Sequence, residues 1–175
     1  MIIDAHAHIF PDKIAEKAVQ GIGSFYDLKM NFDGKVSTLL ETGGKAGVDR
    51  FIVQSVATTP QQVESINNFI AESVKEYPDK LIGFAAIHPD HDNIEGEIER
   101  AVKLGLKGVK IHPDFQRFCI DDEKAMKIYE CIEGRLPLLV HTGDHRYEWS
   151  KPERMARVLD KFPKLQVIGA HFGGW

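Results

Sequence analysis

Short apolar runs alternate with longer amphipathic segments along nearly all of this chain, and that alternation constrains its fold more than any other feature. The short runs are apolar on both faces and are bounded by glycine, proline or polar turn residues. Strands have this pattern when helices cover both faces of a parallel sheet. The segments between them carry apolar residues at helical spacing. The predicted strands are residues 2–9, 50–56, 81–88, 108–112, 138–141 and 166–171.

The repeated strand–helix order predicts an α/β fold. Two architectures have this order, the doubly wound sheet and the (β/α)8 barrel, and periodicity alone does not choose between them. The length of 175 residues suits one domain, residues 1–175, with a buried core. Residues 11–35 depart from the pattern. Their glycines and polar residues predict a long insertion after the first strand, either a functional lid or a plain surface excursion.

Charge and composition narrow the partners. The net charge is −4 and the chain has no basic run, which argues against nucleic acid. No apolar run approaches the ~18 residues that span a bilayer, so no membrane partner is expected. The first ten residues, MIIDAHAHIF, lack the pattern of a signal peptide. Cys119 and Cys131 are not in a CxxC pair and read as reduced thiols, so a cytoplasmic protein is expected.

The histidines are concentrated where ligands bind in parallel α/β folds. Five of the eight lie at the C-terminal ends of predicted strands, the edge that carries the binding site in such folds. They are His8, His88, His112, His141 and His171.

His6 and His8 form the most suggestive pair among these histidines. They lie two residues apart in the first predicted strand, so their side chains share a face and their Cα atoms are roughly 6–7 Å apart. Two imidazoles at that spacing can bind one metal ion, and burying both without a metal or partner would be costly. With His141 and His171 they make four imidazoles at one edge, a nitrogen-rich set that suits zinc or a similar divalent ion.

Four sequence motifs, taken together, resemble the amidohydrolase superfamily. They are DAHAH at the start, GVKIHP, LLVHTGD and the final VIGAHFGGW. The resemblance is to the amidohydrolase-related branch, which includes aminocarboxymuconate-semialdehyde decarboxylase and uncharacterised metal-dependent hydrolases. It implies a distorted (β/α)8 TIM barrel, here incomplete with about six of eight β/α units, and a metal at the C-terminal mouth.

The resemblance also implies roles for individual residues. His6, His8 and His141 are expected to be metal ligands, and His171 a catalytic general acid/base or, in two-metal relatives, a further ligand. One divalent ion is expected, zinc first and manganese second. A second metal becomes an option if Lys110 is carboxylated, as a strand-four lysine is in two-metal relatives.

Several other residues near strand ends are candidates for binding substrate. Three interpretations of Lys110 are open: a carboxylated lysine that bridges two metals, an ammonium that binds substrate, or a side chain that extends from the strand toward solvent and has no catalytic role. His112 precedes a proline, which favours an extended strand end, and is expected to contact substrate. Arg117 and Arg146 follow strand ends and could hold a carboxylate, with a plain surface role as the alternative.

The family pattern continues with strands seven and eight, and strand eight supplies a metal-binding aspartate. This chain stops at Trp175, after the sixth predicted strand. We expect a truncated form of a longer enzyme, with weak or no activity as it stands. The alternatives are a partner subunit that completes the barrel and a shortened relative without catalysis. The first and sixth strands would then be unpaired edges.

The sequence therefore predicts metal-dependent hydrolysis of an amide, lactone or related acyl bond in a small molecule, through a metal-activated water. Within the family, non-oxidative decarboxylation or hydration of a small unsaturated or aromatic carboxylic acid uses the same ligands and is the alternative. An inactive metal- or ligand-binding fragment is the rival from another class. A dinucleotide- or nucleotide-binding domain is disfavoured, because no GxGxxG or GxxxxGK[ST] follows a strand. Homo-oligomerisation is left open.

Overall fold

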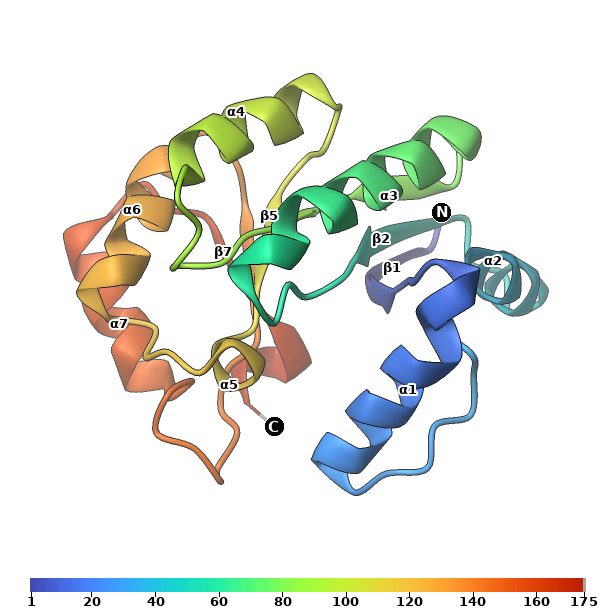
Figure 1. Ribbon diagram of the computed structural model, residues 1–175, viewed down its shortest axis with the longest axis horizontal. Helices are drawn as coiled ribbons and strands as arrows, with labels where there is room; N and C mark the ends of the chain where they lie inside the picture. Colours follow the sequence, from blue (N-terminus) through green and yellow to red (C-terminus); the bar gives the residue numbers. More distant parts are fainter. Residues whose placement is uncertain (175) are drawn as a thin grey trace.

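The computed structural model describes residues 1–174 (Figure 1). Trp175, the last residue of the final motif, lies outside the described residues. Every strand pairing is parallel, in two sheets of order β1-β2-β3 and β4-β5-β6-β7. The strands are β1 Ile3–His8, β2 Arg50–Gln54, β3 Leu81–Gly83, β4 Ala85–Ala86, β5 Val109–Ile111, β6 Leu138–Val140 and β7 Val167–Gly169.

A break at Phe84 divides the strand that the sequence predicts over residues 81–88. Before it, β3 pairs with β2, and after it, β4 pairs with β5. Phe84 N still donates to Val53 O, whereas Ala85 N donates to Gly108 O. The chain therefore passes from one sheet to the other within three residues, and pairing continues without a gap in sequence order.

This sequential order answers the architectural question that periodicity leaves open. A doubly wound sheet reverses its strand order at a switch point, whereas in a (β/α)8 barrel each strand lies beside the next along the chain. All the described strands follow the second pattern. Figure 1 shows the helices arranged around the outside of the strands. The fold of the described residues is thus a parallel α/β fold of the barrel type, with six strand positions, β3 and β4 counted as one, and α-helices after the first five.

Helices connect the strands as the apolar stripes predict. The third helix of the chain illustrates this, because Val63 and Ile70, two apolar residues seven positions apart on one face of the helix, are fully buried. The helices are α1 Asp12–Tyr26, α2 Val36–Lys45, α3 Val63–Glu76, α4 Ile94–Lys103, α5 Pro113–Gln116, α6 Glu123–Ile132 and α7 Pro152–Lys161, with 3-10 turns η1 Pro60–Gln62 and η2 Ala170–Gly173. None of the helices in residues 1–174 is long and apolar enough to cross a membrane.

The core lies between the strands and their covering helices. Val109, Ile111, Leu138 and Val140 are fully buried, which explains why these strands are apolar on both faces. Burial of this kind supplies most of the stabilising free energy of such a fold. Cys119 and Cys131 are free thiols.

The expected insertion over residues 11–35 is largely helical. Residues 12–26 form α1, although Gly21 and Gly23 lower intrinsic helix propensity. Gly23 is required by packing, because a Cβ there would lie 2.8 Å from Leu28 O. The helix ends at Asp27, which adopts a left-handed conformation (φ 52°), and an irregular segment leads on to α2. Tertiary contacts therefore override the local glycine signal.

Candidate metal centre

The first strand positions two imidazoles for a shared ligand. His6 and His8 lie on one face of β1, and their Nε2 atoms are 3.1 Å apart. A cation about 2.1 Å from each nitrogen would subtend an angle of about 95° at that separation, which lies within the range of four- to six-coordinate ions. The pair therefore fits a divalent metal.

Histidines from the other strand ends continue from this pair. The ring of His171 lies 5.1 Å from that of His6 and 5.1 Å from that of His141. The ring of His112 stacks on that of His141, with centroids 4.0 Å apart. These residues follow or belong to β1, β5, β6 and β7, so the curvature of the sheets brings the first and last strands to one site.

His171 does not lie in a strand as the sequence predicts. The last strand, β7, ends at Gly169, and His171 follows in the turn η2 with a left-handed backbone (φ 55°). His171 is exposed to solvent. The turn nevertheless holds its ring against both His6 and His141, where a proton-transferring group is expected.

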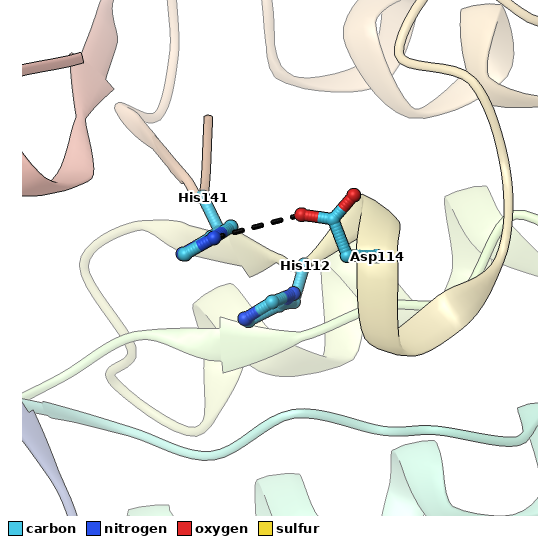
Figure 2. Close-up of side chains that lie close together, drawn as sticks. All are labelled: His112, Asp114 and His141. Carbon is cyan, nitrogen blue, oxygen red and sulfur yellow. Dashed lines mark ion pairs between the residues drawn. The ribbon is translucent and has the colours of Figure 1, made fainter. Parts of the chain in front are cut away.

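A buried carboxylate lies beside His141 (Figure 2). Asp114, the second residue of the short helix α5, places Oδ2 3.5 Å from His141 Nε2, and both side chains are fully buried. Among residues 1–174, His112, Asp114 and His141 form one group whose ligand atoms all lie within 4.8 Å of one another, and Glu64, His91 and Glu97 form the other. The predicted ligands His6 and His8 are not in the group of His141.

Lys110 is buried among these histidines. It lies in β5, is 1% exposed, and its Nζ has no hydrogen-bond partner among the described residues. Burial lowers the pKa of Lys110 to about 7. The pKa values of four histidines are lowered, mainly by burial and next by the positive charge of Lys110. The pKa falls to about 3 for His6 and for His141. The other two are His8 and His171.

The histidines are accordingly neutral at pH 7, the form that binds metal ions. Burial raises the pKa of Asp114 to about 6, against the opposing effects of the Ser150 hydroxyl and Arg146. Ser150 Oγ is near enough to act on Asp114 but makes no hydrogen bond of ordinary geometry. Buried polar atoms that have no hydrogen-bond partner within residues 1–174 therefore gather at the carboxyl ends of these strands, which fits a site for a metal or a polar ligand.

Tyr26 is a site residue that the sequence did not reveal. Its Oη lies 2.9 Å from His112 Nε2. Because His112 Nδ1 accepts from Phe115 N, the neutral ring carries its proton on Nε2 and donates it to Tyr26. Tyr26 ends α1, within the expected insertion, and no motif marks it.

Gln116 is a second residue that the sequence did not reveal. Its Nε2 donates to Ala57 O and Ile87 O, and its Oε1 accepts from His112 N. One buried side chain thereby connects the segments that follow β2, β4 and β5. It fixes the backbone from which His112 and Asp114 project.

The two arginines named from the sequence lie in different settings. Arg146 donates from Nε and Nη2 to Asp144 and from Nη1 to Phe25 O, and its guanidinium lies 4.8 Å from the Phe25 ring centroid. It therefore joins the loop after β6 to α1. Arg117 directly follows α5, has a left-handed backbone conformation (φ 57°) and is exposed.

The strand ends present histidines, a lysine and a carboxylate at one edge of the fold. These side chains at that edge of a barrel-type α/β fold are typical of metal-binding proteins. The sequence pattern of the family described as Amidohydrolase matches residues 3–175. The chain belongs to that amidohydrolase family, as the resemblance implied.

Solved structures show the same fold. 5-Carboxyvanillate decarboxylase from Novosphingobium aromaticivorans, complexed with manganese and 4-hydroxy-3-methoxy-5-nitrobenzoic acid, has a TM-score of 0.74 at 18% identity over 99% of this chain and 65% of its own. Dihydroxybenzoic acid decarboxylase from Polaromonas sp. JS666, with manganese and 2-nitroresorcinol, has a TM-score of 0.66 at 17% identity, covering 98% and 65%. 4-Oxalomesaconate hydratase from Rhodopseudomonas palustris has a TM-score of 0.68 at 22% identity, covering 99% and 64%. The chain spans about two thirds of each.

Proposed function

We propose that this chain carries the metal centre of a metal-dependent enzyme that acts on a small molecule, with His6, His8 and His141 as ligands of one divalent cation. The observation that carries the proposal is the 3.1 Å separation of His6 Nε2 and His8 Nε2, next to Lys110, whose Nζ has no hydrogen-bond partner among residues 1–174. Zinc suits the nitrogen-rich ligands, and manganese is supported by the two decarboxylase structures that contain it.

The first candidate reaction is hydrolysis of an amide, lactone or related acyl bond. A divalent cation at this site supplies Lewis-acid polarisation and acidifies water. His171, exposed beside His6 and His141, is placed to accept and return the proton of the attacking water. Lys110 binds a negatively charged group of the substrate. His112, which the sequence predicts as a substrate contact, is buried between the rings of Phe115 and His141 and is bonded to Tyr26, so it acts by positioning His141.

The second candidate is decarboxylation or hydration of a small unsaturated or aromatic carboxylic acid. Lys110 favours it, because a buried ammonium that makes no hydrogen bond to the described part of the chain is suited to a substrate carboxylate. The nitrobenzoic acid, nitroresorcinol and hydratase matches also support an acidic or aromatic substrate. In this reaction His171, which is exposed, takes a proton from water and passes it to the carbon skeleton. Arg117 and Arg146 are weaker candidates for holding a carboxylate, since Arg146 already binds Asp144.

Metal binding by the purified chain tests the site. We expect tight binding of Zn²⁺ or Mn²⁺ in equilibrium dialysis, weakened at least about 10–100-fold by His6→Asn or His8→Asn, since changes even in outer-shell partners cost that much. His145→Asn is the matched control, because His145 is exposed in a loop. Equal affinity for all three variants and the native chain would refute the site.

Product analysis separates the reactions. The metal-loaded chain is offered aromatic and unsaturated carboxylic acids in one set, and amides and lactones in the other. Release of carbon dioxide supports decarboxylation, addition of water to the carboxylic acid without any release supports hydration, and formation of an acid from an amide or lactone supports hydrolysis. A chain that binds metal tightly yet converts neither set is the non-catalytic fragment, and the enzymatic proposal for this chain is then wrong.

A further inference from the structure

Asp114 is a buried carboxylate for which residues 1–174 provide no hydrogen bond of ordinary geometry, although the Ser150 hydroxyl is near enough to lower its pKa. Its side chain is fully buried, and neither Oδ1 nor Oδ2 has a hydrogen-bond partner among the described residues. The Nε2 atom of His141, which faces it in Figure 2, also lacks one. Buried polar atoms of this kind are costly unless something satisfies them, and here two orphaned ligand atoms face each other.

The distance between these atoms suits an ion between them. His141 Nε2 and Asp114 Oδ2 are 3.5 Å apart, longer than the 2.7–3.2 Å range of a good N–H···O bond. A cation about 2.1 Å from each atom would subtend an angle of about 113°, close to tetrahedral. The pair is therefore spaced as two ligands of one cation are.

His112 is close enough to join this pair but is oriented wrongly. Its ring is nearly parallel to that of His141, at an interplanar angle of 8°. A nitrogen lone pair lies in its ring plane, so two stacked rings cannot both direct lone pairs at one ion. Both nitrogens of His112 also have partners, Phe115 N and Tyr26 Oη. His112 thus orients the ring of His141 by stacking.

We propose that Asp114 is a carboxylate ligand of the divalent cation that His141 binds. This rests on the proposed function only in that both use His141. The sequence led us to expect the metal-binding carboxylate from a later strand, whereas Asp114 supplies one from α5. An imidazole and a carboxylate together suit Zn²⁺ or Mn²⁺, and the anionic oxygen offsets the nearby charge of Lys110.

The test compares Mn²⁺ and Zn²⁺ binding by the 175-residue chain and its variants, by titration calorimetry. Asp114→Asn keeps the side-chain shape and removes the charge, and we expect it to weaken binding at least about 10–100-fold. The matched control is Asp121→Asn, since the carboxylate of Asp121 is already paired with Arg154 and Arg157. We expect Asp121→Asn to leave the affinity unchanged.

A second variant keeps the proposal testable if Asp114→Asn does not fold. Asp114→Cys offers a thiolate at the same position, and loading with Co²⁺ should give a sulfur-to-cobalt charge-transfer band that the native chain lacks. A folded Asp114→Cys chain that binds Co²⁺ without this band would overturn the proposal.

The variants also distinguish the two metal assignments. If His8→Asn weakens binding and Asp114→Asn does not, Asp114 is no ligand and the His6–His8 site stands. If Asp114→Asn weakens binding and His8→Asn does not, the cation lies at His141 and Asp114 and the His6–His8 assignment fails. Weakening by both supports the role of Asp114. A stoichiometry of one ion per chain then means that one ion uses both pairs, and a stoichiometry of two means that His141 and Asp114 bind an ion of their own.

Discussion

Among single residues, Lys110 imposes the clearest cost on the fold. Its ammonium is 1% exposed, and its Nζ makes no hydrogen bond to the described residues. A charge removed from water without a partner destabilises the folded state, and the pKa of about 7 reflects that cost. Residues kept at such a cost are typical of functional sites, where stability and activity oppose each other.

Replacing this ammonium should stabilise the metal-free chain. Between pH 7 and about 10.5 the unfolded state holds the lysine proton and the folded state does not, so native stability rises with pH across that window. Lys110→Met should therefore raise the free energy of unfolding by a few kcal/mol at pH 7 and by progressively less toward pH 10.

Urea unfolding with a chelator present, at pH 7 and pH 10, measures this difference. Lys107→Met is the control, because Lys107 is exposed, and we expect little change. A gain for Lys110→Met that is the same at both pH values would contradict the titration argument.

The histidine positions were predictable from sequence, but their companions were not. His6, His8 and His141 lie in or directly after apolar strands, where period-two alternation and strand ends fix their placement. Asp114 and Tyr26 reach the site from α5 and the end of α1. Their positions depend on how helices pack, and no periodic pattern in the sequence carries that information.

Among the elements, the strand over residues 81–86 joins the two sheets, and a buried side chain supports it. Asn67 in α3 donates from Nδ2 to Ala86 O and accepts at Oδ1 from Ala86 N, and it also donates to Glu97. The sequence predicts the strand because its residues are apolar. It does not predict the break, because both halves remain apolar and only their pairing partners change.

Removing this amide should weaken the connection between the sheets. Asn67→Ala leaves both main-chain groups of Ala86 without their side-chain partner, which should cost about 1–3 kcal/mol of unfolding free energy. Asn68→Ala is the control, since Asn68 is exposed and contacts Arg100 at the surface. Thermal and urea unfolding should show a clear loss for the first variant and at most a small one for the second, and equal losses would argue against the role of Asn67.

Two adjacent glycines in α2 offer a matched test of helix packing. A Cβ at Gly43 would collide with the ring of Phe51 in β2, whereas a Cβ at Gly44 would meet nothing within 4 Å. Gly43→Ala should therefore destabilise by about 1–3 kcal/mol, and Gly44→Ala should stabilise by up to about 1 kcal/mol. Urea midpoints that move in the same direction for both variants would contradict the packing of α2 against β2.

At the scale of the whole molecule, strand–helix alternation predicted parallel strands covered by helices, and the family resemblance implied the barrel-type order. Right-handed crossovers leave few arrangements for such a sequence, but alternation alone does not distinguish the barrel from the doubly wound sheet. Alternation does not determine curvature, which depends on the break at Phe84 and on side-chain packing. Among the described residues the strand order runs from β1 to β7 across the two sheets, and β1 and β7 each pair on one side.

Removing the metal should lower the free energy of unfolding of the whole chain. A cation at 100 times its dissociation constant adds about 2.7 kcal/mol to the folded state. For a chain of this size that corresponds to about 5–11 °C in Tm. Differential scanning calorimetry with Zn²⁺ or Mn²⁺ against chelator should show this rise, and its loss in His8→Asn is the check on specificity. No rise at saturating metal would contradict binding to the folded state.

The position of His6 against His171 has a mechanical consequence. One ring projects from the first strand and the other from the turn after the last, yet they lie 5.1 Å apart. A cation bound by His6 and His8 of β1 and by His141, which follows β6, would link two parts of the fold that no strand pairing joins directly. The metal-bound chain would then unfold as one cooperative unit. In the metal-free chain, β1 or β7 would unfold locally before the rest.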